Sequence, residues 1–110
     1  MSSEPAPLIF GLRSSVVRSM GAVFAETPEV EQAILYGSRA IGNFRRGSDI
    51  DLCLVGAGLT TQQLFKLENQ LDDLLLPYKI DLSIRDHIDN PELLNHIERV
   101  GTSFYHRNKE

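Results

Sequence analysis

Apolar residues recur at spacings of three to four residues in three parts of this chain, which predicts three amphipathic helices. The spacing runs through residues 8–23, 64–75 and 93–100. Asn90, which is followed by proline, marks the start of the last helix, because an asparagine side chain can cap the free N–H groups of a first turn. The threonine pair at 60–61 can cap the middle helix in the same way.

Short apolar or alternating runs predict three strands, at residues 29–36, 49–55 and 78–84. Residues 38–44 leave room for one or two further helical turns between the first two strands. The Phe-Tyr pair at 104–105 fits either a final short strand or an edge on which a partner docks. Because helices and strands alternate, we expect an α/β (α+β) fold, a small mixed β-sheet flanked by about four helices.

The length of 110 residues corresponds to one domain, which we expect at residues 8–110, behind a short flexible tail at residues 1–7. The start does not resemble a signal peptide, and no run approaches the roughly 20 apolar residues of a membrane span, so we expect a cytoplasmic protein. The net charge of −4 and the pI near 5.3 argue against independent nucleic-acid binding, which needs a basic face. Cys53 is the sole cysteine, which excludes an internal disulfide.

Three aspartates lie on the polar faces of two predicted strands. Asp49 and Asp51 point the same way, with Cα atoms about 6.5 to 7 Å apart, so both carboxylates can reach one Mg²⁺ ion. Asp81, on the next strand, can either deprotonate an attacking hydroxyl or hold a second ion. A pair of aspartates on a half-exposed strand is ordinarily only a solvated edge. However, like charges this close cost stability without a cation, which favours a metal site.

The turn after the first strand has the composition of a phosphate-binding loop. Gly37 has no Cβ, so a phosphate chain can approach the backbone closely. Ser38 adds a hydroxyl donor, and Arg39 can add a charge-assisted contact. The ten residues 39–48 separate this turn from the Asp49-Ile50-Asp51 segment. The spacing of the two motifs, each at the end of a strand, is far more specific than either motif alone.

Gly37-Ser38, ten intervening residues and Asp49-Ile50-Asp51 together resemble the signature of the polymerase-β-like nucleotidyltransferase superfamily. The short chain is most similar to its minimal nucleotidyltransferase (MNT) branch, whose members are often antitoxins. The resemblance implies that Gly37 and Ser38 bind the nucleotide phosphates, to which the charge of Arg39 would add, and that Asp49 and Asp51 are catalytic magnesium ligands. It implies that Asp81 is the third catalytic carboxylate, either as the base or as a further metal ligand.

The same resemblance implies an activity and a partner. It implies Mg²⁺, with two ions expected, and ATP as substrate, from which AMP passes to a partner protein. The implied partner is a small helical HEPN-domain ribonuclease toxin, which the transfer silences. Two alternatives stay open: an inactive antitoxin that neutralises its partner by binding alone, and a nucleotidyltransferase for small molecules. Ile41 stands where close relatives often carry a basic residue, which bears on the catalytic rate more than on metal binding.

Other reactive side chains carry no comparable pattern. His87, His96 and His106 are dispersed and lack metal-ligand spacing, so we expect no catalytic role for them. Cys53 is expected to be a small filler, since a nucleophilic cysteine would need an adjacent base. The Arg-Arg pair at 45–46 is expected at a solvated loop tip.

Overall fold

The computed structural model describes residues 8–108, so the tail predicted at residues 1–7 lies outside the described part. No helix within that part is long and apolar enough to cross a bilayer. In chain order the elements are α1 (Ser14–Ala25), β1 (Gln32–Tyr36), α2 (Ser38–Ile41), β2 (Ile50–Val55), α3 (Thr61–Asp72), β3 (Ile80–Ile84), the 3-10 turn η1 (Arg85–His87), α4 (Pro91–Val100) and β4 (Thr102–His106).

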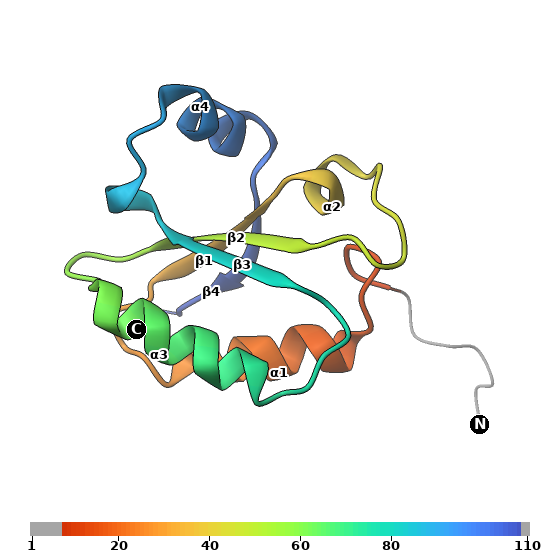
Figure 1. Ribbon diagram of the computed structural model, residues 1–110, viewed down its shortest axis with the longest axis horizontal. Coiled ribbons are helices and arrows are strands. Elements are labelled where there is room, and N and C mark those ends of the chain that lie inside the picture. Colours follow the sequence, from red (N-terminus) through yellow and green to blue (C-terminus); the bar gives the residue numbers. More distant parts are fainter. Residues whose placement is uncertain (1–7, 109–110) are drawn as a thin grey trace.

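The strands form one four-stranded mixed sheet in the order β3-β2-β1-β4 (Figure 1). β2 and β3 are parallel and are joined through α3, because a parallel pair needs a crossover connection. β1 is antiparallel to both β2 and β4. The predicted fold class is therefore confirmed. Tyr105 pairs with Ala33 of β1, which shows that residues 104–105 belong to a strand.

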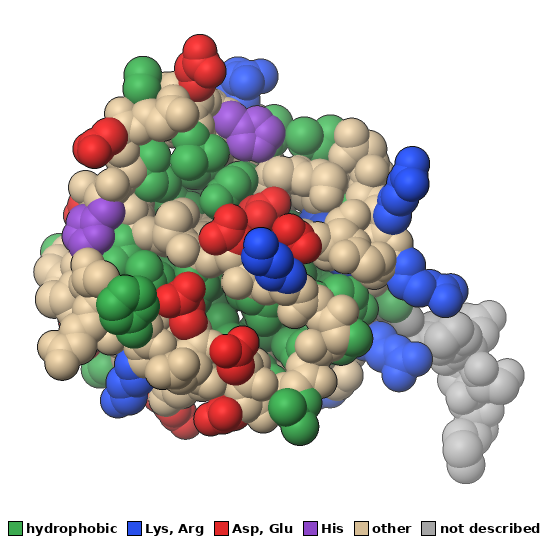
Figure 2. Space-filling model, in the orientation of Figure 1, with side chains coloured by type: hydrophobic (Ala, Val, Ile, Leu, Met, Phe, Trp, Pro, Cys, Tyr) green, Lys and Arg blue, Asp and Glu red, His purple; other side chains and the backbone are tan. Residues whose placement is uncertain are grey.

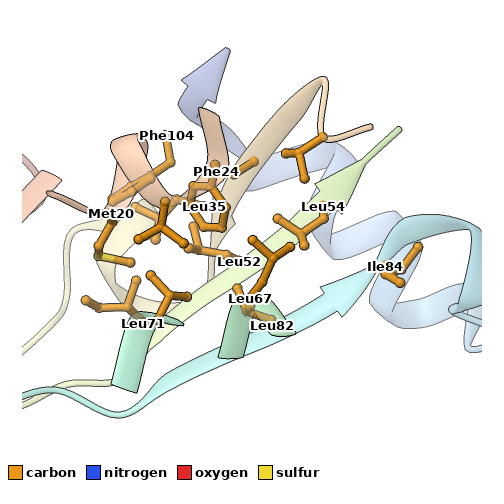
Figure 3. Close-up of a cluster of buried hydrophobic side chains, with 14 of the residues drawn as sticks. Met20, Phe24, Leu35, Leu52, Leu54, Leu67, Leu71, Leu82, Ile84 and Phe104 are labelled. Atoms are coloured by element: carbon orange, nitrogen blue, oxygen red, sulfur yellow. The ribbon is translucent and has the colours of Figure 1, made fainter. Parts of the chain in front are cut away.

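The two faces of the sheet are covered differently. α1 and α3 lie along one face, whereas α2 and α4 lie on the other (Figure 1). Figure 3 shows the main core on the first face, where side chains of α1 and α3 meet those of the strands. Ile50, Leu52 and Leu54 of β2 are fully buried in this core, as their alternation predicted. The intervening residues of β2 consequently face α2 and α4, and this second face carries the predicted aspartates.

Two predicted helix starts are confirmed in atomic detail. The Thr60 hydroxyl accepts a hydrogen bond from the N–H of Gln63, and the Gln63 side chain accepts one from the N–H of Thr60. The Asn90 side chain accepts from the N–H groups of Glu92 and Leu93. These bonds satisfy N–H groups that have no partner within their helices, which sets where α3 and α4 begin.

The first helix begins later than the apolar spacing predicted, at Ser14. The preceding residues form a tight turn, in which Ile9 and Leu12 exchange two backbone hydrogen bonds of 2.8 Å. Phe10 and Gly11 have φ angles of 56° and 76°, and a right-handed helix cannot include residues in that region. The apolar residues of this turn matched a helical period by coincidence of spacing.

The middle helix ends earlier than predicted, at Asp72 rather than beyond residue 75. Leu75 has a φ angle of 54° and is 88% exposed, so it belongs to a turn and not to the buried stripe. The run of leucines before Pro77 extended the apolar pattern past the true end of the helix.

Candidate active site

The ends of three neighbouring strands bring Tyr36, Asp51 and Asp81 into one row across the sheet. Tyr36 of β1 is the register partner of Asp51 in β2, and Asp51 is the register partner of Asp81 in β3. Directly opposite residues point to the same face, and neighbouring strands lie about 4.8 Å apart. The pairing of β2 with β3 therefore places Asp81 beside Asp51.

The carboxylates of this row interact electrostatically. Figure 2 shows acidic side chains gathered over β2 and β3 near the middle of the view. Burial raises the pKa of Asp51, and the negative charges of Asp81 and Asp49 raise it further, while Lys79 and His96 act in the opposite direction. Lys79, which precedes β3, thus lies near enough to the carboxylates to act on Asp51. The sequence pattern of residues 49–55 alone contains no basic residue on this face.

The donor set of this cluster fits a hard divalent cation. Its atoms are carboxylate oxygens, their mutual repulsion raises the pKa of Asp51, and Mg²⁺ is commonly held by one or two carboxylates together with substrate phosphates. Within residues 8–108, however, no group of three or more His, Cys, Asp or Glu side chains is placed closely enough to hold a metal ion. Asp49 precedes β2 and is exposed, so the strand does not fix its side chain against the other two.

The Gly37 turn lies directly against the Asp51 carboxylate. Gly37 has φ 77° and ψ −156°, a conformation that side-chain-bearing residues rarely adopt. A Cβ atom built on Gly37 would lie 2.4 Å from Asp51 Oδ2. Ser38 begins α2 immediately afterwards and is half-buried. The structure therefore brings the two halves of the sequence motif, separated by ten residues, into contact.

Replacing Gly37 with Ala should damage this site more than the fold around it. The methyl group would collide with Asp51 Oδ2, and the positive φ of this residue is strained for alanine. The turn must therefore shift away from the carboxylate. We expect label transfer from ATP to fall about a hundred-fold and the free energy of unfolding to fall by about 1 to 2 kcal/mol. Gly42→Ala is the matched control, since its φ is also positive (96°) but a Cβ there meets nothing within 4 Å. Equal losses of activity in the two variants would contradict a specific role for Gly37.

Arg39 is buried and is committed to the backbone. Its guanidinium donates hydrogen bonds to the carbonyl oxygens of Phe10, Arg46 and Ser48, at distances between 2.8 and 3.2 Å. It also lies over the rings of Phe44 and Tyr78, 5.1 and 5.0 Å from their centroids. Arg39 therefore ties down the loop that leads into Asp49. The predicted contact between Arg39 and a nucleotide phosphate stays a prediction.

His96 reaches the Gly37 turn from α4, which the sequence interpretation missed. Its Nε2 atom accepts a hydrogen bond from the N–H of Gly37 at 3.3 Å, and its ring meets that of Tyr36 edge-on. The available signal was positional. His96 lies three residues after Leu93 and four before Val100, on the predicted buried stripe, so it had to point toward the sheet.

Tyr36 and Cys53 complete the polar face of the sheet beside the carboxylates. Burial raises the pKa of Tyr36, a hydrogen bond with Ser83 acts against this, and the charges of Asp81 and Asp51 raise it further. Cys53 is fully buried, and burial is also the main cause that raises the pKa of its thiol. A buried thiol with a raised pKa is a poor nucleophile, in keeping with the predicted filler role.

Asp51 should cost the folded protein stability at neutral pH. Its pKa is raised above the ordinary 3.8, so the unfolded chain loses this proton first and stability falls as the pH rises through that interval. Because the side chain is only partly buried and solvent screens its charge, we expect Asp51→Asn to stabilise the protein by only about 0.5 kcal/mol at neutral pH, or roughly 2 °C in Tm. Thermal unfolding should show this gain shrinking as the pH falls toward the ordinary pKa of 3.8 and vanishing below it, while the exposed-site control Asp89→Asn shows neither effect. A variant less stable than the wild type at neutral pH would contradict this electrostatic account.

Comparison with known proteins places this arrangement in a family. Residues 19–110 match the family model for polymerase beta, nucleotidyltransferase, and no curated protein matches the chain. Among solved structures, the chain is similar to one in a toxin–antitoxin complex with AMP-PNP (TM-score 0.68, 20% identity, 84% of this chain and 74% of that chain covered). It is also similar to a chain of the MntA–HepT toxin–antitoxin complex (TM-score 0.64, 16% identity, 86% and 74% covered).

A third similar structure contains a modified toxin. It is the complex of the tri-AMPylated HEPN toxin of Shewanella oneidensis with an MNT antitoxin (TM-score 0.64, 17% identity, 84% and 71% covered). At these identities the likeness concerns the fold. The family model, by contrast, spans most of the sequence, including every residue of the Gly37 turn and the carboxylate row. This protein is therefore a member of the polymerase beta nucleotidyltransferase family.

Proposed function

We propose that this protein transfers AMP from ATP to a hydroxyl group of a partner protein, and that the partner is a HEPN-domain toxin in the same cytoplasm. The observation that carries the proposal is the contact of the Gly37 turn with the Asp51 carboxylate, since a Cβ at Gly37 would lie 2.4 Å from Asp51 Oδ2. Nucleotidyl transfer needs a phosphate-binding turn beside metal-binding carboxylates, and this contact provides both.

The described residues have distinct parts in this reaction. The Gly37 turn and the Ser38 hydroxyl hold the phosphates that will leave, and Asp49 and Asp51 would hold Mg²⁺, with Asp81 in register beside Asp51 on the neighbouring strand. Bound Mg²⁺ supplies positive charge that neutralises the phosphate oxygens and makes the α-phosphorus more electrophilic. Most of the rate enhancement then comes from positioning and electrostatic stabilisation.

The transfer itself needs one proton acceptor. The acceptor hydroxyl oxygen attacks the α-phosphorus, the bond from this phosphorus to the bridging oxygen breaks, and pyrophosphate leaves. Asp81 takes the hydroxyl proton, because it is exposed and lies in register beside Asp51 near the start of β3. The alternative role for Asp81, as a ligand of a second ion, would leave this proton to solvent.

The choice of a protein acceptor rests on size and on the similar structures. The sheet and its helices use nearly the whole described chain, which leaves presentation of the hydroxyl group to a partner in this proposal. The similar complexes pair a toxin with an antitoxin, one contains AMP-PNP and another an AMPylated toxin, and they support the same arrangement here. A small-molecule acceptor is the weaker alternative, since the described elements include no additional domain to bind one.

Label transfer from α-labelled ATP into proteins of the host lysate tests this function and identifies the acceptor. With Mg²⁺ present, we expect the wild-type protein to label one small protein and the Asp49→Asn/Asp51→Asn variant to label none. Label at the variant's background level with every nucleoside triphosphate would reject the enzymatic proposal.

A neutralising protein that acts by binding alone is the second candidate, and Ile41 favours it because this exposed position beside the phosphate turn carries no positive charge. Co-expression with the identified partner separates the two functions. If chemistry neutralises the partner, the double variant should bind it without protecting the cells. If covering the partner suffices, the double variant should protect as well as the wild type.

A further inference from the structure

The imidazole of His96 makes the side-chain contact that holds the Gly37 peptide in place. His96 is half-buried on α4, and its Nε2 atom lies 3.3 Å from the backbone nitrogen of Gly37. The two residues are 59 positions apart in the chain, so the contact depends on the packing of α4 against β1. Tyr36 supports it from the sheet, because its ring meets the imidazole edge-on with centroids 6.1 Å apart and an interplanar angle of 83°.

The Gly37 residue is constrained from both of its peptide groups. Its N–H is bonded to His96, and its carbonyl oxygen accepts hydrogen bonds from the N–H groups of Ala40 and Ile41, at 3.2 and 3.1 Å. The short helix α2 supplies the second constraint, but α2 spans only Ser38–Ile41 and cannot by itself orient the residue before it. The peptide between Tyr36 and Gly37 is therefore held by the pairing of Tyr36 with Asp51 on one side and by the His96 contact at its N–H.

The direction of the hydrogen bond defines what a replacement for His96 must supply. In this contact the Gly37 N–H donates and Nε2 accepts, so only a side chain with an acceptor atom at that position can keep the bond. His96 also lies close enough to the carboxylates to lower the pKa of Asp51. An uncharged acceptor at this position can bond the Gly37 N–H without adding a fourth negative charge beside Asp49, Asp51 and Asp81.

We infer that His96 is a positioning residue for the nucleotide, which acts through the Gly37 peptide by holding the phosphate-binding turn against Asp51. This inference rests on the proposed function, because the nucleotide is the ligand that the turn would hold. His96 itself need not touch the substrate. Without its acceptor the turn samples other orientations, and ATP binds to the fraction of molecules in which the turn is correctly placed.

Substitutions at His96 separate the hydrogen bond from simple packing. Gln places an acceptor oxygen near the position of Nε2, whereas the shorter Asn places it near Nδ1, out of reach of Gly37. One neutral hydrogen bond corresponds to a factor of about 5 to 10. We therefore expect His96→Asn to raise KM for ATP about 5- to 10-fold while kcat changes less than about two-fold. His96→Gln should stay within about two-fold of the wild type in both constants.

A control variant and a second measurement separate the role of His96 from misfolding and from the enzymatic proposal. His87→Asn, on the exposed turn η1, should leave both constants unchanged, and thermal unfolding shows whether each variant is folded. Amide exchange of Gly37 in the free protein reports the hydrogen bond itself. It should be about 5- to 10-fold faster in His96→Asn than in the wild type or His96→Gln.

The outcomes distinguish the positioning role from the reaction. Unchanged KM and unchanged Gly37 exchange in His96→Asn would overturn the inference, as would a His96→Gln variant as defective as His96→Asn. If the wild type transfers no label, the proposed enzymatic function fails, and titration with Mg²⁺-ATP replaces KM. Weaker ATP binding by His96→Asn than by His96→Gln would then still support the positioning role, and absence of ATP binding by the wild type would overturn both.

Discussion

Replacing Asp51 with Asn is expected to lower AMP transfer about a thousand-fold, because it removes the carboxylate at the centre of the site. Asp51 has Asp81 beside it on β3 and the Gly37 turn against its Oδ2 atom. Asn is nearly identical in shape but supplies no negative charge for Mg²⁺. The measurement is the initial rate of label transfer from α-labelled ATP to the partner.

Stability measurements make this loss interpretable. The same variant is expected to be slightly more stable than the wild type at neutral pH, since burial and like charges raise the pKa of Asp51. A folded, stabilised and inactive variant would show that the fold tolerates the carboxylate only at a cost. The matched substitution Asp89→Asn, at an exposed aspartate after η1, should leave the rate unchanged. An Asp51→Asn variant with more than about a tenth of the wild-type rate would contradict the assigned site.

Replacing Arg39 with Lys is expected to lower the free energy of unfolding by about 2 to 3 kcal/mol, or roughly 10 °C in Tm. The guanidinium serves three carbonyl oxygens, those of Phe10, Arg46 and Ser48, from three different nitrogen atoms. A lysine ammonium is a single point and cannot reach all three, so buried carbonyl groups lose their partners. Thermal and denaturant unfolding measure the difference.

The Arg39 variant also tests the nucleotide contact predicted from the sequence. If Arg39 acts mainly by tying down the loop before Asp49, stability and transfer should fall together, and a stabilising osmolyte should recover part of the transfer. Arg45→Lys, at an exposed position of the same loop, is the control and should change neither. A raised KM for ATP with unchanged stability would instead support direct contact between Arg39 and a phosphate.

The parts of the fold that local chemistry determines could be predicted from the sequence. In β2, Ile50, Leu52 and Leu54 alternate with polar residues, and the structure buries all three on the predicted side. Thr60 and Asn90 have side chains that are favoured at helix starts, and both cap one. These signals are reliable because the geometry that each requires involves residues only a few positions apart.

The errors occurred where apolar spacing had no local stop signal. The first helix was predicted to start before the tight turn at Phe10 and Gly11. An amphipathic helix and a compact apolar turn can bury residues at the same spacing, so the pattern did not distinguish them. At the end of α3, Leu75 continued the leucine pattern although the chain had already turned. Positive φ angles at residues with side chains are set by tertiary packing, which no spacing rule contains.

Long-range contacts account for the rest of the site. The motif spacing predicted that the Gly37 turn and Asp51 would meet, and a Cβ at Gly37 would lie 2.4 Å from Asp51 Oδ2. His96 was discounted because histidines were judged by ligand spacing, and its role depends on the position of α4 over β1. The burial of Arg39 could not be predicted from the sequence, because it depends on Phe44 and Tyr78, which lie on separate segments. Its predicted phosphate contact stays a prediction.

The most direct test of nucleotidyl transfer follows the two ends of ATP in parallel, with purified protein, its partner and Mg²⁺. One reaction contains ATP labelled at the α-phosphate and the other contains ATP labelled at the γ-phosphate. We predict that α-label appears in the partner and γ-label in free pyrophosphate, with both signals absent in the Asp49→Asn/Asp51→Asn variant. Label from the γ-phosphate in the partner, or release of inorganic phosphate in place of pyrophosphate, would contradict the account.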